Sequence, residues 1–129
     1  MKIEIQRIEN FEYKVGNKAF PIIITILSDE NREIAKKVDI NSALLIKSDD
    51  DTVCFGFSQC ITGMPGETLI IDHESPYKIE VDVFTDDEEL DDFVSGSYQL
   101  KVNVSVFEKQ ESGEFRLVEL SKESEFLIK

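Results

Sequence analysis

The chain has few of the side chains that enzyme active sites and metal centres most often use. Its 129 residues include one histidine, two cysteines and no tryptophan. One imidazole and two thiols cannot close a tetrahedral zinc site without help from carboxylates. Glycine-rich phosphate loops, zinc-peptidase motifs and nucleophile elbows are also missing from the sequence. We therefore expect a protein that is not an enzyme and that has no catalytic residue, resident metal or cofactor.

The single histidine and the two cysteines each allow a structural and a functional interpretation. His73 stands between Asp72 and Glu74 in a predicted loop, where a histidine is more often a solvated residue than a base. A dyad of His73 with Cys54 or Cys60 stays open, although no local motif supports it. For the cysteines we favour two reduced thiols with at least one in the core. The alternative is a disulfide across a short loop, which requires an oxidising compartment.

Long apolar segments are absent as well. No apolar run approaches the roughly 20 residues that a membrane-spanning helix needs. Residues 1–7 alternate apolar and polar side chains and contain no continuous apolar core of a signal peptide. We expect a cytoplasmic protein that does not associate with membranes.

Positive charge is scarce, and its distribution is uneven. The chain has a formal net charge of −13 at neutral pH. Residues 1–48 have 8 Lys and Arg against 7 Asp and Glu, whereas residues 49–129 have 6 against 20. Such a field repels nucleic acids and anionic membranes and attracts basic proteins or divalent cations. The alternative is that the charge serves solubility alone.

Alternation of apolar and polar residues is the dominant pattern in the sequence. A strand with one buried face repeats every two residues, whereas a helix repeats every 3.6 or so. The pattern is longest in two segments, whose apolar members are Tyr98, Leu100, Val102, Val104 and Val106, and Tyr77, Ile79, Val81 and Val83. Shorter examples are Phe11-Tyr13-Val15 and Val53-Phe55-Phe57. The segment Phe20 to Leu27 is apolar on both faces and predicts a central strand.

Turn residues separate these segments at close spacing. Gly16-Asn17 predicts a tight hairpin, and Pro65-Gly66 predicts a turn before a strand at residues 67–72. Glu111-Ser112-Gly113 predicts a turn before a strand at residues 115–117. A further turn at Ser121-Lys122-Glu123 is expected before the last strand, residues 126–128. Eight or nine short strands follow from this count, which is typical of a sandwich or barrel.

Two segments are ambiguous. Residues 28–38 are compatible with a helix capped by Ser28, or with a turn at Asp29-Glu30-Asn31 followed by an edge strand, which we favour. Residues 85–93 predict a single helical turn, capped by Thr85, with acidic residues at its positive N-terminus. Residues 1–129 are thus expected to form a single all-β domain, a two-sheet antiparallel β-sandwich with at most one or two short helical turns.

The segment from Leu90 to Leu100 resembles the approach to strand F of immunoglobulin-like sandwiches. There, a short turn leads into a Gly-x-Tyr sequence whose tyrosine hydroxyl bonds back to the backbone. Gly96-Ser97-Tyr98 matches this pattern, so the resemblance implies a corner role for Tyr98. It covers roughly residues 63–128 and implies an immunoglobulin-like architecture, not a function.

Two acidic clusters are the candidate functional residues. They are Asp49, Asp50 and Asp51 in one predicted loop, and Asp86, Asp87, Glu88, Glu89, Asp91 and Asp92 in another. As a charged surface they would steer a basic protein partner. If both loops met at one pole, their carboxylates would instead suit calcium, although neither has the spacing of an EF-hand. A third interpretation is a solvated loop and a helix N-terminus.

We therefore expect a non-catalytic, acidic protein-binding module that does not bind nucleic acid. One concrete form is an inhibitor or immunity-type protein that masks a basic partner. The alternatives are a structural subunit of a larger assembly and a calcium-binding sandwich. Because aromatic anchors supply most affinity at interfaces, Phe84 and Phe107, which lie opposite the apolar faces of their strands, are candidate contacts. The alternative is that a second sheet covers both.

Overall fold

The computed structural model describes residues 1–14, 20–48, 53–61, 67–82 and 95–129, with the backbone alone for residues 53–61. These residues form eight strands and no helix. The strands are β1 (Lys2–Arg7), β2 (Pro21–Leu27), β3 (Arg32–Lys47), β4 (Val53–Ile61), β5 (Thr68–Ile71), β6 (Tyr77–Asp82), β7 (Gly96–Lys109) and β8 (Phe115–Ile128). The predicted hairpin at residues 16–17, the turn at 65–66 and the helical turn at 85–93 lie outside the described residues.

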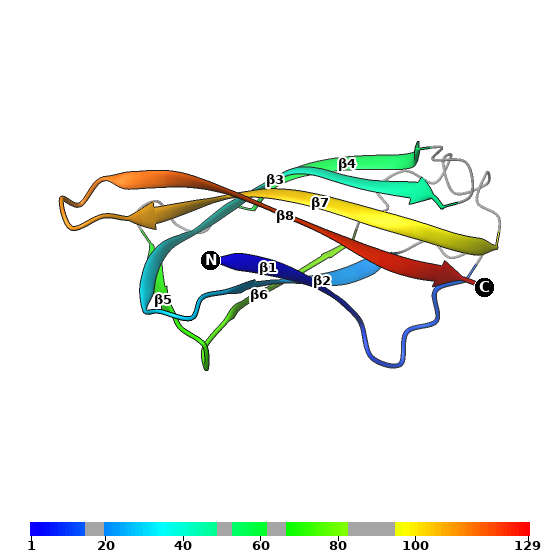
Figure 1. Cartoon of the computed structure of the whole chain (residues 1–129), viewed down its shortest axis with the longest axis horizontal. Coiled ribbons are helices and arrows are strands. Elements are labelled where there is room, and N and C mark those ends of the chain that lie inside the picture. Colours follow the sequence, from blue (N-terminus) through cyan, green and yellow to red (C-terminus); the bar gives the residue numbers. More distant parts are fainter. Residues whose placement is uncertain (15–19, 49–52, 62–66, 83–94) are drawn as a thin grey trace.

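The strands form two antiparallel sheets that pack face to face (Figure 1). The small sheet has the order β1-β2-β6. The large sheet has the order β4-β3-β7-β8, and β5 pairs with the first residues of β3. Every strand pair is antiparallel. The predicted all-β, two-sheet sandwich is therefore confirmed.

The core lies between the facing sides of the two sheets. Alternate residues of β7, from Tyr98 to Val106, are almost fully buried and form one wall, as their periodicity predicts. Ile22, Ile24 and Ile26 of β2 form the opposite wall, and β2 is the central strand of its sheet, as predicted. Ser105 is an exception on the outer row of β7, because the Asn41 side chain covers it and donates a 2.7 Å hydrogen bond to its hydroxyl.

Residues 28–47 resolve the first ambiguity in favour of turn and strand. The Ser28 hydroxyl donates to the Glu30 carbonyl and accepts from the Glu30 amide, which closes a local turn. β3 then runs for 16 residues. The expectation of an edge strand is wrong, because β3 pairs with β7 on one side and with β4 and β5 on the other.

Two further strand predictions are wrong. Residues 11–14 form no strand. Phe11 is half-buried and Tyr13 is buried, and both pack in a cluster of aromatic rings without pairing with another strand. The turn expected at residues 121–123 does not form either, and β8 continues through it for 14 residues. Ser121, Lys122 and Glu123 each pair with a residue of β7, which compensates for their weak strand preference.

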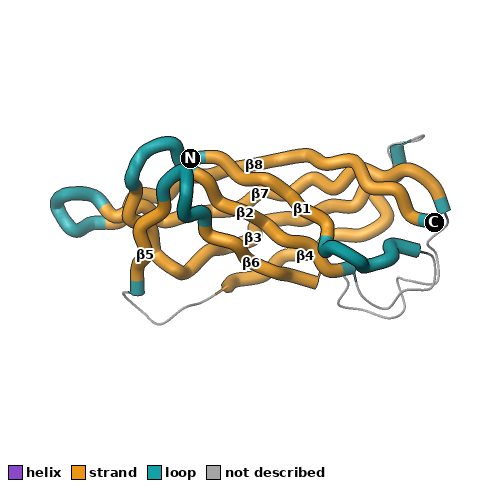
Figure 2. Tube along the Cα trace, turned by 90° about the horizontal axis from the view of Figure 1, so that it is seen from below, coloured by secondary structure: helices purple, strands orange, loops and turns teal. Residues whose placement is uncertain are grey.

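The β7–β8 hairpin extends past the small sheet at one end of the molecule (Figures 1 and 2). Its turn is the predicted one: the Gly113 amide donates to the Gln110 carbonyl, and the Gln110 amide donates to Glu114. Gly113 has a φ of 88°, a conformation that glycine adopts without the strain of a Cβ atom. Fourteen consecutive residue pairs then join β7 to β8.

Candidate functional site

The acidic residues predicted as the contact surface lie outside the described residues. This holds for Asp49, Asp50 and Asp51 and for Asp86, Asp87, Glu88, Glu89, Asp91 and Asp92, as it does for Phe84. For Cys54 and Cys60 only the backbone, within β4, is described. The steering, calcium and disulfide interpretations therefore stay predictions.

His73 lies on the surface, as expected for a solvated loop residue. Its side chain is 70% exposed, and its Nε2 atom is 3.6 Å from Glu74 Oε1. Among the described side chains, no three His, Cys, Asp or Glu residues gather in a way that could hold a metal ion. Among the described residues, exposed apolar side chains and surface grooves are therefore the remaining candidates for a functional site.

Apolar side chains gather on the outer face of the large sheet, at the β7–β8 hairpin. Phe107 of β7 is half-buried and stands in register with Leu117 of β8, which is 53% exposed. Phe115, 44% exposed, is two residues from Leu117 on the same face. We call Phe107, Phe115 and Leu117 the hairpin patch. Of the two predicted aromatic anchors, Phe107 is thus partly accessible, on a face that neither of the two described sheets covers.

Charged side chains surround the hairpin patch. The Lys37 ammonium lies 5.4 Å from the centre of the Phe107 ring, within the range of a cation–π contact. Lys109, in register with Phe115, forms a 3.9 Å ion pair with Glu33 of β3. Ile70 of β5, 63% exposed, is in register with Glu33 and extends the same face. An apolar centre with a polar rim is the usual composition of a protein-binding surface.

A carboxylate on the inner face holds the hairpin in place. Glu108 of β7 has a side chain only 7% exposed, and it accepts hydrogen bonds from Arg32 Nη1 at 2.7 Å and Arg116 Nη2 at 3.1 Å. Burial alone raises the pKa of Glu108, but the hydrogen bonds and charges of the two arginines outweigh burial and lower that pKa below its ordinary value. The ion pairs connect the starts of β3 and β8 to the end of β7.

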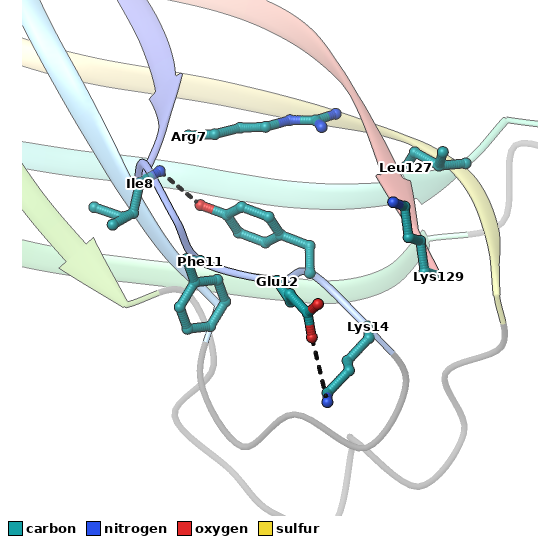
Figure 3. A pocket seen from close by; sticks show the side chains of 8 residues that line it. Arg7, Ile8, Phe11, Glu12, Lys14, Leu127 and Lys129 are labelled. Atoms are coloured by element: carbon teal, nitrogen blue, oxygen red, sulfur yellow. Dashed lines mark hydrogen bonds and ion pairs between the residues drawn. The ribbon is translucent and has the colours of Figure 1, made fainter.

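A groove of about 490 Å³ lies at the other end of β8 (Figure 3). The Arg7 guanidinium lies 4.7 Å from the Phe126 ring centre, and Arg7 Nη2 donates to the Glu125 carbonyl at 3.1 Å. Tyr13 is fixed in the wall: its hydroxyl accepts from the Ile8 amide and donates to the Pro21 carbonyl. Burial is the main cause that raises the pKa of this phenol.

The residues that line the groove have a structural role more than a catalytic or ligand-binding one. Its charged lining consists of Arg7, Lys14 and Lys129 with Glu12, and Lys14 already pairs with Glu12 at 3.5 Å. Arg7 packs on the Phe126 ring and donates a hydrogen bond to the backbone of β8, so it connects β1 to β8 and has a structural role. We therefore place the candidate functional site at the hairpin patch.

Sequence reasoning found only part of this site. It selected Phe107 from its position opposite the buried row of β7. It did not select Leu117 or Phe115, because both faces of an edge strand can be solvated and the sequence does not say which face is outer. The pairing of Leu117 with Phe107 depends on the 14-residue register of the hairpin. The turn at Glu111-Ser112-Gly113 was the signal from which that register could have been counted.

Comparisons with known proteins do not add an identity. No family model and no curated protein matches the chain. Among the described residues, the structure has no helix of the length and apolarity that a membrane crossing requires. Among solved structures, the chain is similar to that of a crystal structure described as a protein from Archaeoglobus fulgidus. The two share 7% identity at a TM-score of 0.45, over 100% of this chain and 97% of the other.

Proposed function

We propose that the protein is a non-catalytic binding module whose hairpin patch contacts a basic protein partner. The observation that carries the proposal is the exposure of Leu117 and Phe115 beside the half-buried Phe107. Rings and leucines that are partly exposed on a rigid sheet cost little conformational entropy on binding. The net charge of −13 supports a basic partner, because opposite charge accelerates encounter. An inhibitor that masks a basic protein is the form we favour.

We also infer that the sandwich is immunoglobulin-like. The strand orders β1-β2-β6 and β4-β3-β7-β8 support this, because they correspond to A-B-E and C′-C-F-G of such domains. β7 then takes the place of strand F, and Tyr98 lies near its start, where the resemblance puts the corner tyrosine. The architecture is compatible with many functions, so it gives no further support to the binding proposal.

The experiment compares two exposed leucines on the same face of β8. Leu117→Lys alters the hairpin patch, whereas Leu127→Lys makes the same change at the far end of the strand, where Leu127 is 51% exposed. Each variant and the wild type serve as bait in affinity capture from the source cells, at low and high salt. We expect one basic protein with wild type and Leu127→Lys, lost at high salt, and about tenfold less of it with Leu117→Lys.

Equal capture by Leu117→Lys and wild type would refute the site, and the absence of any captured protein would refute the function. Thermal melting of both variants is the control for folding, because exposed substitutions are expected to change stability by less than about 0.5 kcal/mol. Recovery of the chain alone at every salt would favour the alternative function, a structural subunit of a homo-oligomer. The position of β8 as the last strand of the large sheet, among the described residues, is the observation that favours that alternative.

A further inference from the structure

β8 is an edge strand, and the direction of its backbone groups can be determined. In a strand, the N–H and C=O of one residue point to the same side, and those of the next residue point to the other. The Glu125 carbonyl accepts from Arg7, and the Lys129 amide donates to the Tyr13 carbonyl, so both point away from β7. By alternation, the outward backbone groups of the preceding part belong to Phe115, Leu117, Glu119, Ser121 and Glu123. We call these five residues the outward row.

Over most of its length the outward row has no hydrogen-bond partner among the described residues, and β1 lies beside part of β8. Arg7 and Tyr13 cover the C-terminal end of β8. Between Phe115 and Ser124, no described residue outside β7 forms a hydrogen bond to the backbone of β8. Proteins protect such an edge with proline, bulges, short strands or charged side chains. β8 has charged side chains, including Lys122 in register with the inner-face residue Val102, but it has no proline and its register with β7 is uninterrupted. The outward backbone groups from Phe115 to Glu123 therefore have no hydrogen-bond partner among the described residues.

The side chains of the outward row determine what could pair there. Phe115 and Leu117 are apolar, Glu119 and Glu123 are acidic, and the row contains no cation. Glu119 forms no ion pair with a described residue, and Glu123 forms only an exposed 3.5 Å pair with Lys101, which contributes little. A second copy of this chain would bring its own glutamates and no cation to the row. A basic strand would neutralise both carboxylates.

We propose that β8 binds its partner by strand addition: an extended basic segment pairs antiparallel with the outward row. It places aliphatic residues opposite Phe115 and Leu117 and Lys or Arg opposite Glu119 and Glu123. The added strand extends the large sheet, and its aliphatic side chains continue the hairpin patch. This inference rests on the proposed function and specifies its mode, with backbone hydrogen bonds for affinity and alternate side chains for selectivity.

The test uses a synthetic capped peptide of about nine residues with Lys and aliphatic residues in those positions. Amide hydrogen exchange of the full chain is followed by NMR with and without the peptide. We expect exchange to slow about tenfold or more at Leu117, Glu119 and Ser121, whose amides point outward. The amides of Val118 and Leu120, which point to β7, are expected to change little.

Two matched changes separate backbone pairing from contact by side chains alone. N-methylation of the peptide amides that face β8 removes donors without changing any side chain, and it should abolish the slower exchange. Glutamate in place of the peptide lysines should weaken binding about tenfold. On the protein, Glu119→Gln should weaken binding of the lysine peptide, whereas Glu74→Gln, in an exposed loop elsewhere, should leave it unchanged.

The outcomes distinguish this inference from the function on which it rests. Absence of peptide binding, or binding without slower exchange of the outward amides, would overturn strand addition. Neither result affects the capture experiment with Leu117→Lys, which tests the binding module independently. If the native partner is captured through Leu117 while the outward amides stay unprotected in the complex, the partner docks on the face of the sheet, and strand addition is wrong.

Discussion

At the scale of single residues, Glu108 is the buried charged side chain among the residues that the structure describes. Its carboxylate is nearly buried and accepts hydrogen bonds from two arginines. Glu108→Gln keeps the size of the side chain but removes the anion that Arg32 and Arg116 share, and Arg32 keeps only its 3.3 Å pair with Glu30. We expect unfolding in urea to show a loss of about 2–3 kcal/mol. Glu111→Gln, in the exposed hairpin turn, is the control and should change stability by less than about 0.5 kcal/mol. Equal effects of the two substitutions would contradict a stabilising role of the ion pairs.

The same carboxylate makes stability depend on pH. The pKa of Glu108 is lowered in the folded state from its ordinary value of 4.5, so the folded chain favours the ionised form. Its contribution is therefore complete above pH 4.5 and is lost as the pH falls through the folded-state pKa. We expect the stability difference between wild type and Glu108→Gln to be constant from pH 7 to about pH 5 and to narrow below pH 4.5 or so. A difference that stays constant down to pH 3 would show that the lowered pKa contributes nothing.

Sequence alone could not identify this residue. Glu108 occupies the next alternate position of β7 after the buried residues Val104 and Val106. From sequence, a glutamate at such a position is interpreted as the solvated end of the strand. The reason is that its partner Arg32 is 76 positions away in the chain, so no nearby residue indicates the ion pair. Long-range ion pairs leave no local pattern in a sequence, and only the register of β3 on β7 brings the two side chains together.

At the scale of elements, the hairpin turn sets the register that forms the hairpin patch. Gly113 has a positive φ, and a Cβ atom placed there would meet no atom within 4 Å beyond its two chain neighbours. The cost of Gly113→Ala is therefore conformational and should be about 1 kcal/mol in urea unfolding. Gly113→Asn should cost less, because asparagine tolerates this region of φ better than alanine does. Equal costs for the two variants would mean that φ is not the cause.

The strands themselves were predictable where burial is one-sided. β7 and β6 alternate clearly because one face packs on the core and the other meets solvent. The full lengths of β3 and β8 were harder to predict from the sequence. Register shifts near residues 40–43 interrupt the alternation of β3, which hides its full length. The second half of β8 contains Ser121-Lys122-Glu123, which are typical of a turn. Pairing with the well-formed β7 compensates for these local preferences, and no local window of sequence contains that information.

At the scale of the whole molecule, the net charge of −13 should cost stability through self-repulsion. Unfolding moves the charges apart, so repulsion destabilises the compact state more than the expanded one. Salt reduces the repulsion, since the screening length falls from about 30 Å at 10 mM to a few ångströms near 0.5 M. The same salt weakens the ion pairs of Glu108, but their carboxylate is nearly buried and their distances are short, 2.7 and 3.1 Å. We expect the repulsion to dominate.

The melting temperature should therefore rise with sodium chloride, by about 3–6 °C between roughly 10 mM and 0.5 M. Glu108→Gln separates the two opposing effects, because it removes the attraction that salt weakens while keeping almost all of the repulsion. Its melting temperature should rise at least as steeply as that of wild type. A fall in melting temperature with salt in the wild type alone would mean that the ion pairs dominate. If the melting temperature fell with salt in both proteins, the attraction between the acidic residues and neighbouring cations would exceed the repulsion among the acidic residues. That result would weaken the case for a basic partner.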